Sequence, residues 1–145
     1  MTTFNTALDA LAAMLGEDET IRDYAVEKWQ YPFTVRREDR NHIPINTDDL
    51  PLILVMRPSV TKTQVVGGRD TKHTVKLYVL FQQADPAKAQ TEAVEAEELI
   101  DDVLLTTEPD TLGIKMLYPG SSRTDDAAVP PVYSIVMDVD IWHRR

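Results

Sequence analysis

Cysteine is absent from the 145-residue sequence, which excludes disulfides, thiolate metal sites and cysteine nucleophiles together. The sequence also has no apolar run approaching the roughly 20 residues that a membrane-spanning helix needs. The N-terminus lacks the basic start and unbroken apolar run of a signal peptide, because Asn5, Thr6 and Asp9 interrupt it. We therefore expect a protein that stays soluble in the cell that makes it and has no membrane partner.

Basic residues are scarce: 15 lysines and arginines stand against 24 acidic residues, giving a net charge of −9. This balance opposes long-range attraction to nucleic acid or to an anionic membrane and favours protein partners. The densest basic cluster runs from Arg36 to Arg40, but Glu38 and Asp39 interrupt it. We interpret that run as a solvated turn and expect no specific nucleic-acid partner.

Hydrophobic residues make up 43% and charged residues 27% of the chain, as in ordinary globular proteins, so we expect a single domain over residues 1–145. Apolar residues at spacings of three and four predict a helix over 3–15, which Gly16 would cap. Residues 17–30 fit either a second short helix or an extended segment. The polar, proline-punctuated stretch 31–49 predicts mostly loop.

The middle of the chain predicts strands. The apolar run from Leu50 to Met56 is typical of a strand buried on both faces. Two β-prone runs, 60–66 and 71–81, flank Gly67, Gly68, Arg69 and Asp70, and glycine pairs permit the tight turn of a hairpin. The alternation in the second run places one set of residues toward the core: Val75, Leu77, Val79 and Phe81.

A long helix should follow, because Asp85 can cap free backbone amides and Pro86 suits the first helical turn. We expect it to run to about Thr106. Its predicted apolar stripe comprises Ala89, Ala93, Ala96, Ile100, Val103 and Leu104. Its predicted outer face carries Glu92, Glu95, Glu98, Asp101 and Asp102. Seven acidic residues and no basic one lie between Ala89 and Glu108, so this helix should present a strongly negative stripe to basic partners or to passing DNA.

The C-terminal third predicts a short strand over 112–117, a loop over 118–131 and a closing strand over 132–142. The loop is rich in glycine, serine, aspartate and proline, which disfavour a packed core. The order of elements implies an α+β fold: a mostly antiparallel sheet with the two main helices packed on one face and a projecting β-hairpin.

No set of reactive side chains converges in the sequence. His42, His73 and His143 have no metal-binding spacing and are interpreted as surface residues. Asp138 and Asp140 share one strand face about 7 Å apart, but the sequence suggests no further metal ligands, so a solvated face is favoured. Gly67 and Gly68 lack the spacing of a phosphate loop, and Ser121 and Ser122 lack a nucleophile motif. We therefore expect no enzyme, no metal and no cofactor.

After the N-terminal helix, the main elements include the segments LPLILVMRP (50–58), TVKLYVLFQQADP (74–86), TEAVEAEELIDDVL (91–104) and VYSIVMDVDIWHRR (132–145). The order and length of these elements resemble the tail terminator and minor tail proteins of long-tailed bacteriophages. The resemblance implies an α+β subunit that forms a ring, commonly a hexamer, on the end of the tail tube in the virion. The implied partners are further copies of the chain, the tail tube protein, and a head-tail connector or neck protein. DNA would pass through the ring.

By this resemblance, the hairpin and the 118–131 loop would supply the contacts with other subunits and with the tube. The candidate interaction residues are Val65, Gly67, Gly68, Arg69, Lys72, Ser121, Arg123, Asp125 and Asp126. Other neck or tail-completion proteins share the same layout. A non-viral regulatory domain that binds a small molecule or peptide is the alternative from another class, although no sequence feature marks its pocket.

Overall fold

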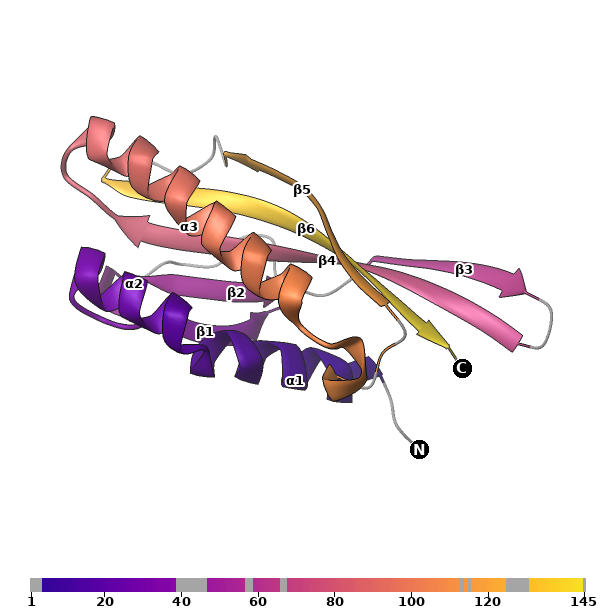
Figure 1. The fold of residues 1–145 in the computed structure, drawn as a ribbon. Helices are drawn as coiled ribbons and strands as arrows, with labels where there is room; N and C mark the ends of the chain where they lie inside the picture. Colours follow the sequence, from indigo (N-terminus) through magenta and orange to yellow (C-terminus); the bar gives the residue numbers. More distant parts are fainter. Residues whose placement is uncertain are drawn as a thin grey trace.

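The computed structural model describes residues 4–38, 47–56, 59–65, 68–112, 114, 116–124 and 131–144 (Figure 1). The helical elements are α1 (Phe4–Glu17), α2 (Glu19–Trp29), α3 (Pro86–Thr106) and the short 3-10 turns η1 (Thr47–Asp49) and η2 (Pro109–Leu112). The strands are β1 (Thr34–Glu38), β2 (Leu52–Met56), β3 (Ser59–Val65), β4 (Gly68–Gln82), β5 (Met116–Thr124) and β6 (Val132–Arg144).

The strands form a six-stranded sheet in the order β1-β2-β4-β6-β5, and β3 pairs with β4 outside this path. β1 runs parallel to β2, whereas every other pairing is antiparallel. β4 is long enough that one of its edges pairs with two strands: residues 77–80 pair with β2, and residues 68–74 pair with β3. The mostly antiparallel α+β architecture predicted from the sequence is therefore confirmed.

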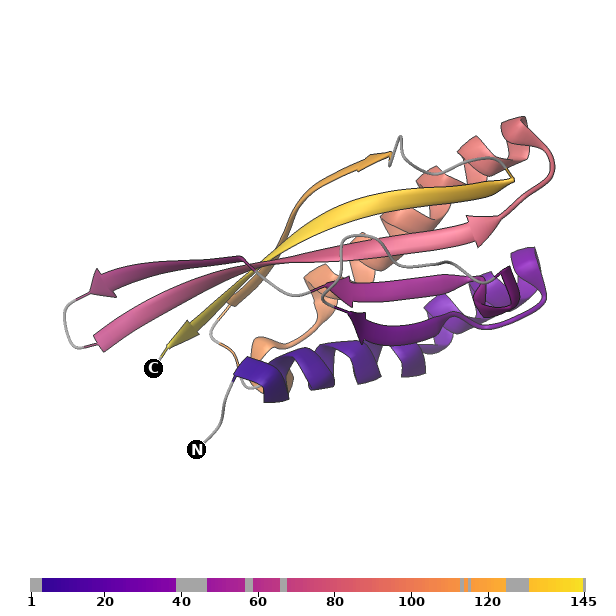
Figure 2. The same cartoon turned by 180° about the vertical axis from the view of Figure 1, so that it is seen from behind.

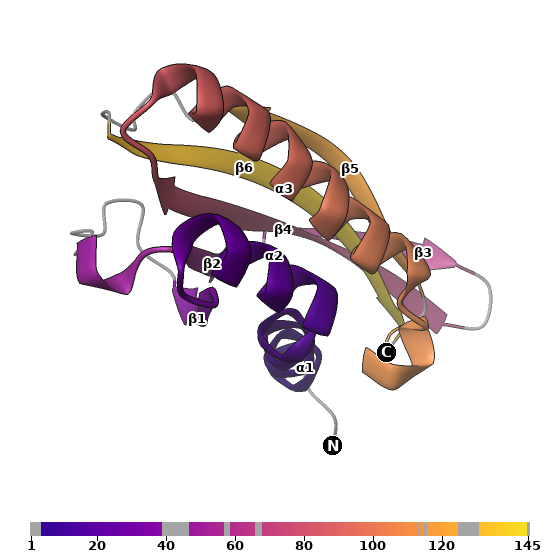
Figure 3. The ribbon, with the colours of Figure 1, turned by 60° about the vertical axis from the view of Figure 1, so that its left-hand side comes forward.

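The α-helices cover one face of the sheet, and the opposite face carries none of the described helices (Figures 1 and 2). Figure 3 shows α3 lying along the β5 and β6 side, with α1 and α2 on the β1 and β2 side. Contacts of α3 with β5 and β6, and of α1 with β1, hold this layer on the sheet. Residues 17–30, for which the sequence left two alternatives, contain the helix α2, so three helices occupy the face predicted to hold two main ones.

The core follows from strand alternation. Residues Val75, Leu77, Val79 and Phe81 of β4 are completely buried and face the helices, as predicted. All five residues of β2 are buried: Ile53 and Val55 join the helix-side core, whereas Leu52, Leu54 and Met56 join a second cluster with Leu80 of β4. β2 is therefore the strand buried on both faces that its apolar run predicted.

Two helix boundaries follow from local capping. α1 continues through Gly16 to Glu17, so the prediction that Gly16 ends this helix is wrong. Asp18 instead begins the next helix, because its side chain accepts a hydrogen bond from the amide of Ile21 at 3.0 Å. The predicted cap of the long helix is confirmed: Asp85 accepts from the amide of Ala87 at 3.0 Å.

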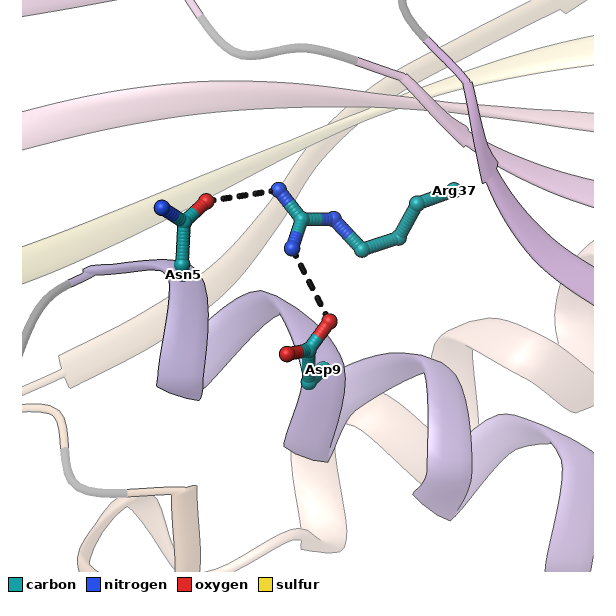
Figure 4. A network of polar contacts seen from close by, with 3 residues as sticks. All are labelled: Asn5, Asp9 and Arg37. Atoms are coloured by element: carbon teal, nitrogen blue, oxygen red, sulfur yellow. Dashed lines mark hydrogen bonds and ion pairs between the residues drawn. The ribbon is translucent and has the colours of Figure 1, made fainter.

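The stretch predicted as mostly loop between Tyr31 and Asp49 contains β1 and η1. Arg36 and Arg37, predicted to lie in a solvated turn, belong to β1. Arg37 donates to Asp9 at 2.9 Å and to Asn5 at 2.8 Å, which links β1 to α1 (Figure 4). Arg36 lies 3.7 Å from Asp49. These arginines therefore already have partners within the chain, whereas Arg40 lies outside the described residues.

Strand β5 is a second correction, since it continues to Thr124 and converts half of the predicted 118–131 loop into sheet. A bulge between Pro119 and Ser121 lets it follow β6 in spite of its glycine and proline. The hairpin is confirmed, but Gly68, Arg69 and Asp70 belong to β4 and not to the turn. The remainder of the loop, 125–130, lies outside the described residues.

Candidate interaction surface

The predicted hairpin residues lie in a β-ribbon that projects beyond the helix-covered part of the sheet (Figures 1 and 2). We call this segment, residues 59–65 and 68–74, the ribbon. Val65 pairs with Gly68, and Arg69 pairs with Gln64. The candidate residues Val65, Gly68 and Arg69 therefore lie near the tip of the ribbon. Gly67, Asp125 and Asp126 lie outside the described residues, so their places in the predicted surface stay predictions.

The other three candidate residues come together on the helix-free face of the sheet. Lys72 comes from β4 and contacts Asp140, with its Nζ 3.7 Å from the carboxylate. Ser121 and Arg123 come from β5 and contact Asp138: the serine hydroxyl donates at 3.2 Å, and the guanidinium lies 3.6 Å away. The Lys72 Nζ also lies 5.7 Å from the centre of the Trp142 ring. Three residues chosen from two distant segments therefore converge on one pair of aspartates.

The two aspartates occupy the middle strand of this surface. Asp140 of β6 pairs with Thr74 of β4 on one side and with Tyr118 of β5 on the other. The Thr74 hydroxyl donates to Asp140 at 2.9 Å, which completes a row of polar contacts over β4, β6 and β5. The second carboxylate oxygen of Asp138, Oδ1, is buried and accepts no hydrogen bond from the described residues. We call this surface, built on Lys72, Ser121, Arg123, Asp138 and Asp140, the aspartate face.

The arrangement does not favour a metal. Lysine and arginine lie beside the two carboxylates, and no group of three or more potential ligands is placed to hold an ion among the residues that the structure describes. His143 lies on the other side of the sheet, where its ring is 5.9 Å from Phe4. His73 is buried and stacks on Phe4 at 3.5 Å, so its prediction as a surface histidine is wrong.

The outer surface of α3 is acidic, as predicted. Glu95, Glu98 and Asp102 are exposed, and no described residue forms an ion pair with them. Burial, with a smaller contribution from the neighbouring Asp102, raises the pKa of Asp101 above its ordinary value. Ionisation of Asp101 in the folded chain therefore costs free energy, mainly through partial burial and to a smaller extent through the charge of Asp102.

This cost makes stability depend on pH. A raised pKa means that the folded chain holds the Asp101 proton more tightly than the unfolded chain does, so stability falls as pH rises through the folded pKa. Asp101→Asn should therefore raise the melting temperature near neutral pH. The gain should vanish below the ordinary pKa, where the carboxyl is protonated in both states.

Thermal denaturation at about pH 7 and at about pH 3 measures this difference. Asp102→Asn is the matched control: it removes the repelling neighbour but keeps the burial, so it should give a smaller gain. An equal gain for Asp101→Asn at both pH values would contradict the electrostatic cause.

Glu92 is a buried acid that the sequence analysis placed on the outer face of the long helix, which is wrong. Only 7% of its surface is exposed, and it faces α2 and the end of β4. Its carboxylate accepts hydrogen bonds from Trp29 Nε1 at 3.2 Å and from Gln83 Nε2 at 2.8 and 3.0 Å. A sequence signal existed, because Glu92 falls at the helical spacing of the stripe that contains Ala89 and Ala96.

Tyr24 extends the same network, since its hydroxyl donates to the backbone oxygen of Glu92 at 3.3 Å. Burial, followed by the charges of Glu95, Glu92 and Glu27, raises the pKa of Tyr24 well above its ordinary range. The phenol therefore stays protonated and remains a hydrogen-bond donor at physiological pH. Glu92, Trp29, Gln83 and Tyr24 together fasten α2 to α3 and to β4.

A groove of about 720 Å³ lies beside this network, at the end of the sheet opposite the ribbon. The residues that line it are Lys28, Trp29, Gln30, Tyr31, Asp48, Leu50, Pro51, Gln82, Gln83, Ala84 and Pro131. Its lining combines aromatic rings and prolines with amide groups and two opposite charges. The sequence analysis did not find it, because its walls come from segments spread over a hundred residues of the chain.

None of the helices in the described part of the chain is both long enough and apolar enough to cross a membrane.

Comparison with known proteins finds a solved structure with a similar fold. No family model matches the chain, and no curated protein matches it in sequence. Among solved structures, the chain is similar to one in a structure named "Virion of native gene transfer agent (GTA) particle". The two are 12% identical, the alignment covers 95% of this chain and 94% of that one, and the TM-score is 0.62. The chain therefore shares its fold, over almost its whole length, with a protein chain of a virion particle.

Proposed function

We propose that this chain is a structural virion protein, a ring-forming tail terminator that caps the tail tube and joins the tail to the head. The observation that carries the proposal is the fold shared, over 95% of the chain, with a chain of a gene transfer agent virion. The match covers that chain almost end to end, so it concerns a subunit of the same size. The order of elements in the sequence independently resembles tail terminator and minor tail proteins.

The sheet borders support assembly with other subunits. Within the described residues, β1, β3 and β5 each pair with a strand on one side only. Unpaired backbone groups at a strand edge are stabilised when another chain supplies the missing hydrogen bonds. In the proposed ring, commonly a hexamer, neighbouring copies meet at such borders.

The aspartate face supports contact with the tail tube protein or with a head-tail connector. Its cations are only partly exposed and are held by carboxylates, and Asp138 still has a buried oxygen with no described donor. A donor from a partner would satisfy that oxygen, since buried acceptors in proteins are almost always hydrogen-bonded. In this proposal the chain acts by surface contact in the virion, without catalysis or a cofactor.

The groove favours a second candidate, a regulatory domain that binds a small molecule or peptide. Its volume of about 720 Å³ is in the range typical of small-molecule sites. Screening the purified chain against a fragment library by ligand-observed NMR would test this function. Specific binding that is abolished by Tyr31→Ala, an exposed residue of the groove lining, in a chain that forms no rings, would favour it over the virion role.

Deletion of the gene for this chain from the genome that encodes the particle tests the proposed role as a tail terminator. Loss of a terminator should leave tubes that grow far beyond their normal length, because nothing stops subunit addition. Loss of a different neck or tail-completion protein should leave tails of normal length that do not join heads. Particles of normal tail length and normal infectivity would contradict a structural role of either kind.

A further inference from the structure

We propose that β5 of one copy pairs antiparallel with β1 of a second copy, so that neighbouring sheets join edge to edge in a ring whose strands run along its axis. The inference deepens the proposed function and rests on it, because it names the two sheet borders that meet between subunits. β1 and β5 are the outermost strands on the two sides of the sheet (Figure 1).

The two borders differ from each other and face opposite ways. Within the described residues, β1 pairs only with β2, and β5 pairs only with β6. A contact between two different borders is head-to-tail, and such contacts close into rings when the rotation between copies is right. One kind of contact then covers both borders of every copy, whereas a strand from a different protein covers only one of them. A closed sheet leaves neither border open.

The directions of the strands agree with an antiparallel joint. β1 runs parallel to β2, and the steps from β2 to β4, from β4 to β6 and from β6 to β5 are all antiparallel. β5 therefore runs opposite to β1 within one chain. Rotation about the ring axis does not change the direction of a strand along that axis, so β5 also runs opposite to β1 of the next copy. Antiparallel pairing is slightly more stable per residue than parallel pairing.

Backbone groups of both strands point out of the sheet at matching positions. The Thr34 amide donates to the Pro51 oxygen at 2.9 Å, so the backbone groups of Thr34 face β2. Backbone groups alternate in direction along a strand, so those of Val35 and Arg37 face outward. The same alternation, carried through the paired strands, leaves the backbone groups of Ser122 facing outward on β5. Val35 and Ser122 can therefore form a hydrogen-bonded pair across the joint.

The register of the sheet sets which side chains meet. One row of paired residues crosses the whole sheet: Arg36, Leu54, Tyr78, Val136 and Arg123. Arg36 and Arg123 thus lie at one height on one face, and a level joint would place them opposite each other. Closing a sheet tilts its strands and staggers the register. A stagger of two residues keeps the faces continuous, separates the arginines and places Arg123 opposite Thr34.

The same stagger gives complementary charges. Arg36 has a 3.7 Å contact with Asp49 in its own chain, and its Nε is buried without a hydrogen-bond partner among the described residues. In the staggered joint Arg36 lies opposite Ser121 of the next copy. The Ser121 hydroxyl donates to Asp138 at 3.2 Å, so the guanidinium faces a carboxylate across a small side chain. A cation of one border therefore meets the aspartate face beside the other.

Disulfide trapping tests the joint, because the chain has no cysteine of its own. A chain with both Thr34→Cys and Arg123→Cys carries one thiol on each border. Four strand spacings, about 19 Å, separate these positions within a chain, so they can link only between copies. Mild oxidation should give a ladder of covalent oligomers that ends at the size of the ring.

Thr34→Cys with Ser122→Cys is the matched control. Ser122 is adjacent to Arg123 in the chain but lies on the opposite face of the strand, so this pair should give at least about tenfold less product. Each single-cysteine variant should give no ladder. A disulfide-linked dimer of either single variant would mean that like borders meet.

Val35→Pro gives a second readout without cysteine. It removes an outward amide hydrogen and places a ring at the border, while the inward hydrogen bond of Thr34 remains. Self-association in sedimentation velocity should weaken at least about tenfold. Val35→Ala, which shortens the side chain but keeps the amide, is the control and should associate like the wild type. Unchanged circular dichroism would show that both variants fold.

The outcomes separate this inference from the proposed function. The face-selective ladder and the loss of association in Val35→Pro would support the joint. Equal ladders from the two cysteine pairs, or rings that Val35→Pro forms as readily as the wild type, would overturn the joint and leave the ring proposal standing. Absence of any ladder, both in solution up to the solubility limit and on tail tubes, would also overturn it, whereas tail lengths after gene deletion would still decide the proposed function.

Discussion

Phe81→Ala is expected to lower the free energy of unfolding by about 3 to 5 kcal/mol, the largest effect of any single change considered. Phe81 has no exposed surface and lies where β4, α2 and β6 meet. Its ring stacks on Trp29 at 4.8 Å and on Tyr133 at 5.9 Å. Alanine would remove these aromatic contacts and leave a cavity that the surrounding rings can fill only in part.

Urea denaturation followed by tryptophan fluorescence measures this loss, because Trp29 reports directly on the cavity. Tyr118→Ala is the matched control: it also replaces an aromatic strand residue, but 55% of Tyr118 is exposed. Its effect should stay within about 0.5 kcal/mol. If the two substitutions cost the same, Phe81 would not be the central packing residue that the geometry indicates.

Glu92→Ala is expected to cost about 2 to 3 kcal/mol, because the Trp29 indole and the Gln83 amide would each lose a buried acceptor. Glu92→Gln keeps one side-chain oxygen that can accept a hydrogen bond and should cost clearly less. The same urea denaturation measures both variants. α2 should loosen first, since Glu92 links it to both α3 and β4, and amide hydrogen exchange in residues 19–29 would detect this.

Glu95→Ala provides the control for Glu92→Ala. Glu95 lies on the same helix and is exposed. Both substitutions therefore change helix propensity by the same amount, from glutamate to alanine, but only Glu92→Ala breaks the buried network. We expect a change within about 0.5 kcal/mol for Glu95→Ala. Equal effects of the two substitutions would mean that the hydrogen bonds to Glu92 contribute nothing to stability.

The elements that the sequence predicted well are those with strong local patterns. β6 alternates apolar and polar residues along its length, β2 is a continuous apolar run, and α3 has both a capping aspartate and an apolar stripe. In each case the pattern within one segment specifies which face is buried. The α+β class followed from the order of these elements.

The elements that the sequence missed depend on partners far away in the chain. β1 has the sequence TVRRE, which has little strand character by itself, and it is held by parallel pairing to β2 and by the contacts of Arg37 with α1. β5 contains Pro119 and Gly120, which predict a loop, yet the bulge accommodates them and β6 supplies the hydrogen bonds. Tertiary pairing overrides weak local propensity in both strands.

The candidate surface was predicted only as separate pieces. The composition of the hairpin and of the 118–131 segment selected Lys72, Ser121 and Arg123, but only the register of β4, β6 and β5 brings them to Asp138 and Asp140. The single-strand alternation did reveal that the two aspartates share a face. It could not reveal their basic partners, because register between distant strands depends on the whole sheet.

In the proposed role, this chain caps one end of a tail tube as a subunit of a closed ring. Electron microscopy of purified tail tubes, incubated with the chain while tube protein is still being added, tests the claim most directly. We predict one closed ring at one end of each tube and no further growth from that end. Tubes that lengthen as they do without the chain, or that bind it along their sides, would contradict it.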